Sequence, residues 1–198
     1  MKMTSAKNID TRKLVLLAFL TAIVIILQIL GAFIRFGPFS ISLVLMPIAV
    51  GAALLGAYAG AWLGLVFGFV VLISGDAAAF MIVNPAATVF VVLLKGALAG
   101  FIAGEFYKIL AHRSKTIAAV AAAVICPVVN SAIFIAGGYI FFLPTLTEWG
   151  IAAGAANVTV FIFVMMVGLN FIVELGINII LSPAIVRLIQ YRQEKYGS

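Results

Sequence analysis

Two charged residues, Lys95 and Glu174, stand inside long apolar segments of the 198-residue sequence. A charge within a membrane-spanning helix costs about 2.5 to 3.5 kcal/mol on insertion scales, so such a residue has either a partner or a function. At a rise of about 1.5 Å per helical residue, the depths of the two residues differ by no more than a lysine side chain and some helix tilt can bridge. Two interpretations stay open: a structural ion pair between two helices, and ligand contacts of either residue or both in a polar cavity.

Uncharged polar residues accompany these charges. Asn170, Glu174 and Asn178 recur at every fourth position, so they form one polar stripe on a helix, and in hydrocarbon that stripe must face protein or water. Asn130, near the middle of another apolar segment, offers both a donor and an acceptor. We expect these groups to hold a small polar solute. Polar residues between neighbouring segments belong to the same set: Asp76, Asn84 and Thr88.

The chemistry of soluble enzymes is largely excluded. Six Asp and Glu residues, one His and one Cys cannot build a multi-ligand zinc or iron–sulfur site, and we expect no metal and no cofactor. No Ser-His-acid set, HExxH or paired-carboxylate motif is present, so we do not expect an enzyme. There is also no GxxxxGK[ST] motif, so ATP-driven transport would need another chain to hydrolyse the nucleotide.

The elements that position these residues are membrane helices. Hydrophobic residues make up 66% of the chain and charged residues only 9%, which is far outside the range of a soluble domain. The apolar runs are unbroken and do not alternate with polar residues, which excludes a membrane β-barrel and gives an all-α integral membrane fold. About 20 apolar residues cross the bilayer once as a helix. We therefore predict a single membrane domain over 1–198, with six transmembrane helices over 14–34, 42–55, 59–73, 86–110, 117–142 and 158–186.

The basic residues predict the orientation of these helices. If the amino terminus is cytoplasmic, all basic residues except Arg35 and Lys95 fall on the cytoplasmic side. This is the positive-inside asymmetry, and it puts both termini in the cytoplasm. Because the basic residues are spread over the ends of separate helices, they do not form a nucleic-acid-binding surface.

Glycines recur at every fourth position in two segments, at Gly56, Gly60, Gly64 and Gly68 and again from Gly96 to Gly104. Glycines at this spacing line one helix face and let a neighbouring backbone approach closely. We favour packing inside the molecule, and a surface for a partner is the alternative.

The sequence resembles a known family over essentially its whole length. The run GPFSISLVLMPIAVG at 37–51, continued by LLG at 54–56 and GLVFG at 64–68, looks like the substrate-binding S components of energy-coupling factor (ECF) vitamin transporters. Further similarity lies in LKGALAG at 94–100 and in the polar residues of 170–178, followed by Pro183.

The resemblance implies a high-affinity vitamin-binding subunit that joins a transmembrane coupling subunit and two cytoplasmic ATPases in a bacterial or archaeal cytoplasmic membrane. In this family a small-residue motif on the first helix contacts the coupling subunit, and Ala18 and Ala22 match it. Substrate in the family lies near the outer face, enclosed by the last three helices and the outer loops. Carried over, this implies ligand contacts by Lys95, Asn130, Asn170 and Glu174, with Asp76, Asn84 and Trp149 in the covering loops.

Among the vitamins, pantothenate is favoured and riboflavin comes second. A carboxylate substrate would give Lys95 or Arg35 a counter-charge, and the acidic segment associated with riboflavin binders is missing after the first helix. Two other classes stay open. One is a stand-alone secondary transporter or channel in which Lys95 and Glu174 relay protons. The other is a membrane assembly factor or small intramembrane enzyme, against which the lack of clustered catalytic residues argues.

Overall fold

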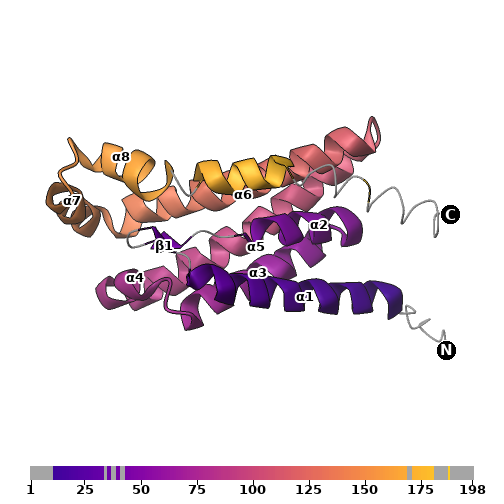
Figure 1. The fold of residues 1–198 in the computed structure, drawn as a ribbon, viewed down its shortest axis with the longest axis horizontal. Helices are drawn as coiled ribbons and strands as arrows, with labels where there is room; N and C mark the ends of the chain where they lie inside the picture. The colour runs from indigo at the N-terminus through magenta and orange to yellow at the C-terminus, as the bar shows by residue number, and fades with distance from the viewer. Residues whose placement is uncertain are drawn as a thin grey trace, which may run out of the picture.

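The computed structural model describes residues 11–33, 35–36, 39–40, 43–168, 171–180 and 187. Within these ranges the chain is a bundle of helices whose longer members lie along the long axis of the molecule (Figure 1). Two strands of two residues each, β1 (Arg35–Phe36) and β2 (Phe39–Ser40), pair antiparallel after the first helix. The principal helices are α1 (Thr11–Ala32), α2 (Leu45–Leu55), α3 (Ala57–Ile73), α4 (Ala78–Val83), α5 (Pro85–Ala111), α6 (Lys115–Phe141) and α7 (Leu143–Ala152).

Four helices in the described part of the chain are long and apolar enough to cross a membrane. They cover Thr11–Ala32, Pro85–Ala111, Lys115–Phe141 and Val158–Ile180. The apolar helices α2 and α3 have 11 and 17 residues, fewer than the roughly 20 of a typical span. The all-α membrane class expected from composition is confirmed, whereas the six spans and the sidedness of the ends stay predictions.

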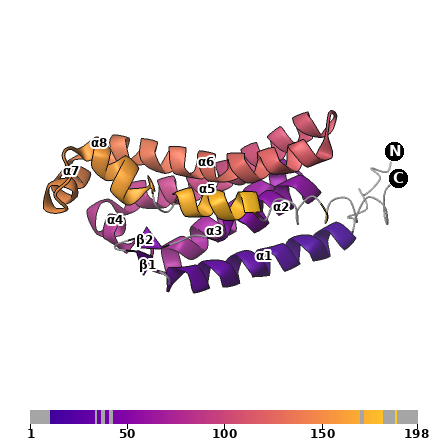
Figure 2. The ribbon, with the colours of Figure 1, turned by 45° about the horizontal axis from the view of Figure 1, so that its top comes forward.

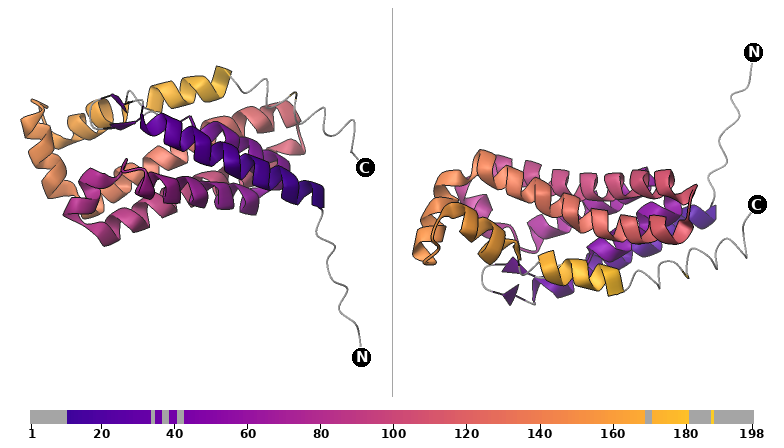
Figure 3. Two further views of the ribbon diagram at one scale, coloured as in Figure 1. Left: turned by 60° about the horizontal axis from the view of Figure 1, so that its bottom comes forward. Right: turned by 90° about the horizontal axis from the view of Figure 1, so that it is seen from above.

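The two ends of the bundle differ in composition and in the elements they hold. Figures 1, 2 and 3 show α4, α7 and the β1–β2 pair gathered at one end of the molecule. The first residues of α1 and the turn between α5 and α6 lie at the opposite end. The basic residues Arg12, Lys13, Lys108, Arg113 and Lys115 belong to this second end.

Local sequence signals explain where the helices begin and end. Gly56 adopts a φ of 98°, which separates α2 from α3 and favours glycine because it has no Cβ. Asn84 caps α5, accepting a hydrogen bond of 3.1 Å from the backbone N–H of Ala87, and Pro85 follows in the first turn, where its missing N–H costs nothing. Ser114 caps α6 in the same way.

Two segments expected to be connections are helical. The segment of α4 was expected to lie in a loop, and α7 lies in what was expected to be the longest connection. In α4, Phe80 is buried, and in α7, Leu146 and Gly150 lie one turn apart and are both buried. These short helices form because apolar side chains at helical spacing can cover the end of the bundle.

The last long segment, expected as one helix over 158–186, is not a regular α-helix. After α8 (Val158–Val160) the backbone forms a π-helical turn, η1 (Phe161–Met166), in which the N–H of Val167 donates to the carbonyl of Ile162 at 2.9 Å. A Cβ at Gly168 would lie 2.6 Å from the carbonyl oxygen of Phe163, so the glycine makes room for the wide turn. Residues 171–180 are helical again, and 169–170 and 181–186 lie outside the described residues.

The centre of the bundle is a backbone contact between α3 and α5. A Cβ added to Gly64 would overlap the carbonyl group of Gly96, and a Cβ on Gly96 would overlap that of Gly64. The pair Gly60 and Gly100 is reciprocal in the same way, and a Cβ on Gly68 would lie 2.8 Å from the carbonyl oxygen of Val92. The expectation that the repeated glycines pack inside the molecule is confirmed for Gly60, Gly64, Gly68 and Gly96 to Gly104, whereas Gly56 is exposed and instead separates α2 from α3.

We predict that Gly64→Ala destabilises the protein by about 1 to 3 kcal/mol, the usual cost of overpacking, because the new methyl group must push two helix backbones apart. Unfolding in detergent can be followed with a thiol-reactive fluorophore, since Cys126 is the sole cysteine and is buried. Gly176→Ala is the matched control, because a Cβ there meets nothing within 4 Å. Equal melting temperatures for the two variants would contradict the prediction.

Candidate functional site

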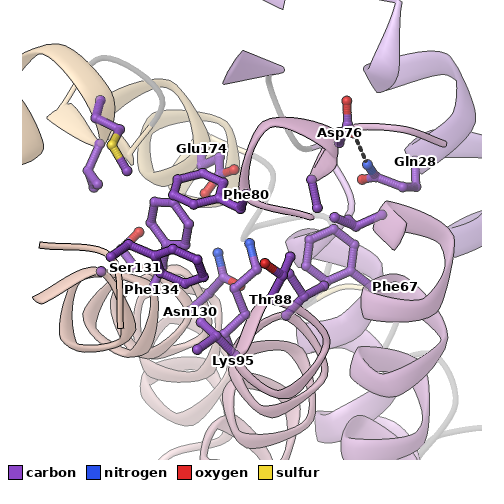
Figure 4. A pocket seen from close by; sticks show the side chains of 18 residues that line it. Gln28, Phe67, Asp76, Phe80, Thr88, Lys95, Asn130, Ser131, Phe134 and Glu174 are labelled. Atoms are coloured by element: carbon purple, nitrogen blue, oxygen red, sulfur yellow. Dashed lines mark hydrogen bonds between the residues drawn. The ribbon is translucent and has the colours of Figure 1, made fainter. Parts of the chain in front are cut away.

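A cavity of about 110 Å³ lies between α1, α3, α4, α5 and α6 and the helical segment 171–180 (Figure 4). This is several times the roughly 10 to 15 Å³ that one water molecule needs, so the space suits a small organic molecule. Its polar lining comes from four helical elements and the turn before α4: Gln28, Asp76, Thr88, Lys95, Asn130, Ser131 and Glu174. Four phenylalanines share the wall: Phe67, Phe80, Phe134 and Phe142.

The structure brings together five of the residues singled out in the sequence: Asp76, Thr88, Lys95, Asn130 and Glu174. Lys95 interacts electrostatically with the carboxylates of Glu174 and Asp76. Figure 4 shows Lys95 and Asn130 on one side of the cavity and Glu174 opposite. The two buried charges therefore belong to one polar site. Lys95 and Glu174 can interact with each other across the helices and still contact a solute in the cavity.

Aromatic rings flank the lysine. The Nζ atom of Lys95 lies 5.5 Å from the ring centroid of Phe67 and 5.1 Å from that of Phe134. At these distances the ring faces attract a cation, and the attraction is larger in a site that excludes water. The lysine thus has carboxylates and ring faces around it before any ligand enters.

Gln28 is the residue of this site that sequence reasoning missed. It is 2% exposed, and its Nε2 donates a hydrogen bond of 2.6 Å to Oδ2 of Asp76 (Figure 4). The bond ties α1 to the turn between α3 and α4. The signal in the sequence was a single amide within the apolar first helix, since a polar side chain there must face protein or water.

The cavity wall contains two amides whose buried acceptor atoms are unsatisfied. Within the described residues, Oε1 of Gln28 and Oδ1 of Asn130 accept no hydrogen bond. A buried polar atom without a partner costs about 1 to 3 kcal/mol, so such atoms are uncommon in a finished core. Their presence in the wall of a cavity indicates that something entering the cavity donates to them.

The comparison with known families agrees with this geometry. A family model described as "ECF transporter, substrate-specific component" matches residues 12–186. The chain belongs to this family. No curated protein and no solved structure matches the chain. Members of the ECF substrate-specific family are transport subunits, and a multi-pass membrane protein with a polar internal cavity fits that role.

Three other predicted site residues of this ECF component do not line the cavity or cannot be placed. The side chain of Asn84 caps α5, and its backbone carbonyl accepts a hydrogen bond of 2.7 Å from Thr88 Oγ1, so it supports a lining residue. Trp149 stacks edge-on against Phe80, with ring centroids 5.4 Å apart, and so lies one layer outside the wall. Asn170 lies outside the described residues, and its role stays a prediction.

The remaining predicted residues, Ala18 and Ala22, are exposed on α1. Exposed apolar side chains surround them, with Phe19 at 62% and Ile26 at 56%. Gln28 on the same helix is buried and lines the cavity. In this ECF component, within the described residues, α1 therefore has one side that lines the pocket and one side that is exposed.

We predict that Gln28→Met lowers the stability of the ligand-free protein by about 1 kcal/mol or more, because Asp76 loses a hydrogen bond while the side-chain volume is kept. Ile26→Met on the exposed face of α1 is the matched control. Thermal unfolding of both variants in detergent measures the difference. The same melting temperature for both would show that the Gln28–Asp76 hydrogen bond adds nothing to stability.

Proposed function

We propose that this chain is the high-affinity vitamin-binding subunit of an ECF-type ABC importer, and that the cavity beside Lys95 holds the vitamin. The observation that carries the proposal is the cavity itself, with a polar wall from four helical elements and one turn and with two amides whose buried acceptors are unsatisfied. Lys95, Asn130 and Glu174 are proposed to contact the substrate, and Asp76 to complete the wall with Gln28. Asn170 is proposed to join them, and Asn84 and Trp149 to hold the cover in place.

The exposed face of α1 is the proposed docking surface for the transmembrane coupling subunit. Small side chains at Ala18 and Ala22 let a second helix approach the backbone closely, which is how membrane helices associate. Two cytoplasmic ATPases complete the proposed transporter and supply the energy, because this sequence has no nucleotide-binding motif.

The proposed surroundings are a bacterial or archaeal cytoplasmic membrane, with six spans and both termini inside. The clustering of basic residues at the end that holds the start of α1 and the α5–α6 turn supports this orientation. The cavity then opens in the outer half of the membrane, below α4 and α7. Pantothenate and riboflavin, in that order, are the vitamins that the sequence favours.

The alternative is a stand-alone secondary transporter. The observation in its favour is the pair of intramembrane charges, Lys95 and Glu174, in one cavity, because buried ionisable pairs serve as proton relays in such carriers. The two functions differ in their dependence on other chains, because a secondary transporter works alone, whereas an ECF binding subunit requires the coupling subunit and the ATPases.

We predict that Ala18→Trp abolishes assembly with the coupling subunit and leaves vitamin binding within about twofold of the unaltered chain, because the indole blocks helix approach on the face away from the cavity. Co-purification with the coupling module measures assembly. Ile140→Trp, a substitution at a 71% exposed residue of α6, should leave assembly intact. A complex that survives Ala18→Trp would remove this face from the interface.

We further predict that native mass spectrometry of the detergent-purified chain, from cells grown in rich medium, detects a vitamin-sized adduct. In proteoliposomes, the chain alone should bind this compound without accumulating it, and uptake should require the coupling subunit, both ATPases and ATP. Accumulation by the chain alone under a proton gradient would contradict the proposal and support the secondary transporter.

A further inference from the structure

We infer that the cavity selects an uncharged, flat heteroaromatic compound. The protein recognises an edge of this compound on which an N–H donor stands beside a carbonyl acceptor. The inference rests on the proposed function, since it takes the cavity as the substrate site. It differs from the ranking made from sequence, in which Lys95 favours an acid.

The first step is the orientation of the Gln28 amide. Its Nε2 donates to a carboxylate oxygen of Asp76, and because an ionised carboxylate only accepts, the amide cannot be reversed. Oε1 is thereby fixed as an acceptor, buried and without a donor among the residues the structure describes. A ligand that satisfies this oxygen must bring an N–H or O–H group.

The second step is Asn130 on α6. Its side chain is 6% exposed, its Oδ1 lacks a donor within the described part of the chain, and the same amide carries an NH₂ group. A carboxamide pairs in two parallel hydrogen bonds with an edge that presents one donor and one acceptor side by side, as Asn and Gln pair with adenine. Amide and imide edges of heterocycles have this pattern.

The third step is the shape of the apolar wall. Phe67, Phe80 and Phe134 come from α3, α4 and α6 and line the same cavity. Phe80 also packs edge-on against Phe134, with centroids 5.7 Å apart, so the rings support one another. Ring faces and edges held in this way bind a planar ring better than a flexible chain, because aromatic contacts add to the burial of apolar area.

The fourth step is charge. The ammonium group of Lys95 already interacts with two carboxylates and two ring faces, so it does not require an anion from the substrate. An acid placed beside Lys95 would also stand near Asp76 and Glu174, and a cation placed beside those carboxylates would stand near Lys95. A site of mixed charge therefore favours an uncharged ligand, since like charges in a site of low dielectric repel strongly.

The test uses five compounds and the purified full chain in detergent, with binding measured by titration calorimetry. Riboflavin and nicotinamide are uncharged rings with an imide or amide edge. Their matched partners are 3-methylriboflavin, which lacks the imide N–H, and nicotinate, which replaces the amide by a carboxylate. Pantothenate is the acyclic acid. We expect riboflavin or nicotinamide to bind, its matched partner to bind at least about tenfold more weakly, and pantothenate not to compete.

The outcomes separate this inference from the proposed function. If pantothenate or nicotinate binds more tightly than both uncharged rings, the inference is overturned and the proposed function stands. If a matched partner binds as well as its parent, the reading of the N–H edge is overturned. If none of the five binds and no small molecule is retained by the purified chain, both proposals fail.

A variant pair tests the role of Asn130 separately. Asn130→Asp keeps the shape and removes the amide donor, so affinity for the uncharged ring should fall at least about tenfold. Asn157→Asp is the control, since Asn157 is an exposed cap of α8 where Asp serves equally well. Unchanged affinity in Asn130→Asp would remove this residue from recognition. If that variant does not fold, the comparison of matched ligands on the unaltered chain still decides.

Discussion

The contact between the α3 and α5 backbones is the constraint on which the rest of the structure depends. Two reciprocal glycine pairs, Gly60 with Gly100 and Gly64 with Gly96, leave no room for side chains between the helices. Lys95 is next to one of these glycines, and a Cβ on Gly96 would meet the ring of Phe67 at 3.3 Å. Close backbone approach therefore puts a lysine from one helix within reach of an aromatic ring from the other. The close packing of α3 against α5 and the position of Lys95 in the cavity wall therefore both follow from the four-residue spacing of the glycines.

The first helix links the cavity to the surface proposed to meet the coupling subunit. Its buried face holds Gln28 against Asp76, and its exposed face carries Ala18 and Ala22. Ten residues separate Ala18 from Gln28, roughly 15 Å along an α-helix. The hydrogen bond to Asp76 thus ties α1 to the turn that helps to line the cavity.

The sequence predicted most of what depends on local pattern. The glycine spacing predicted the α3–α5 packing, and the cost of burying charge identified Lys95 and Glu174, which the structure brings to one cavity. What it missed depends on tertiary contacts. In the sequence, Gln28 is a single amide in an apolar helix. The segments of α4 and α7 were predicted to be loops, because helices this short form only when they pack against the rest of the folded bundle. Trp149 was expected in a covering loop, and the structure places it on α7, where it packs edge-on against Phe80. Spacing along a chain does not predict such a contact.

The charge of the substrate shows most clearly why the structure changes the argument. The sequence left two roles open for Lys95, an ion pair with Glu174 or a ligand contact, and a lysine in contact with a ligand favours an anionic one. In the folded chain, carboxylates from two other elements and two ring faces surround Lys95, so the unmet requirement moves to the acceptor oxygens of Gln28 and Asn130. A site whose buried acceptors depend on donors from the ligand rejects compounds that lack those donors, because the protein then keeps the cost of the unsatisfied atoms. Specificity in such a site comes from the buried acceptor atoms that the protein itself does not satisfy.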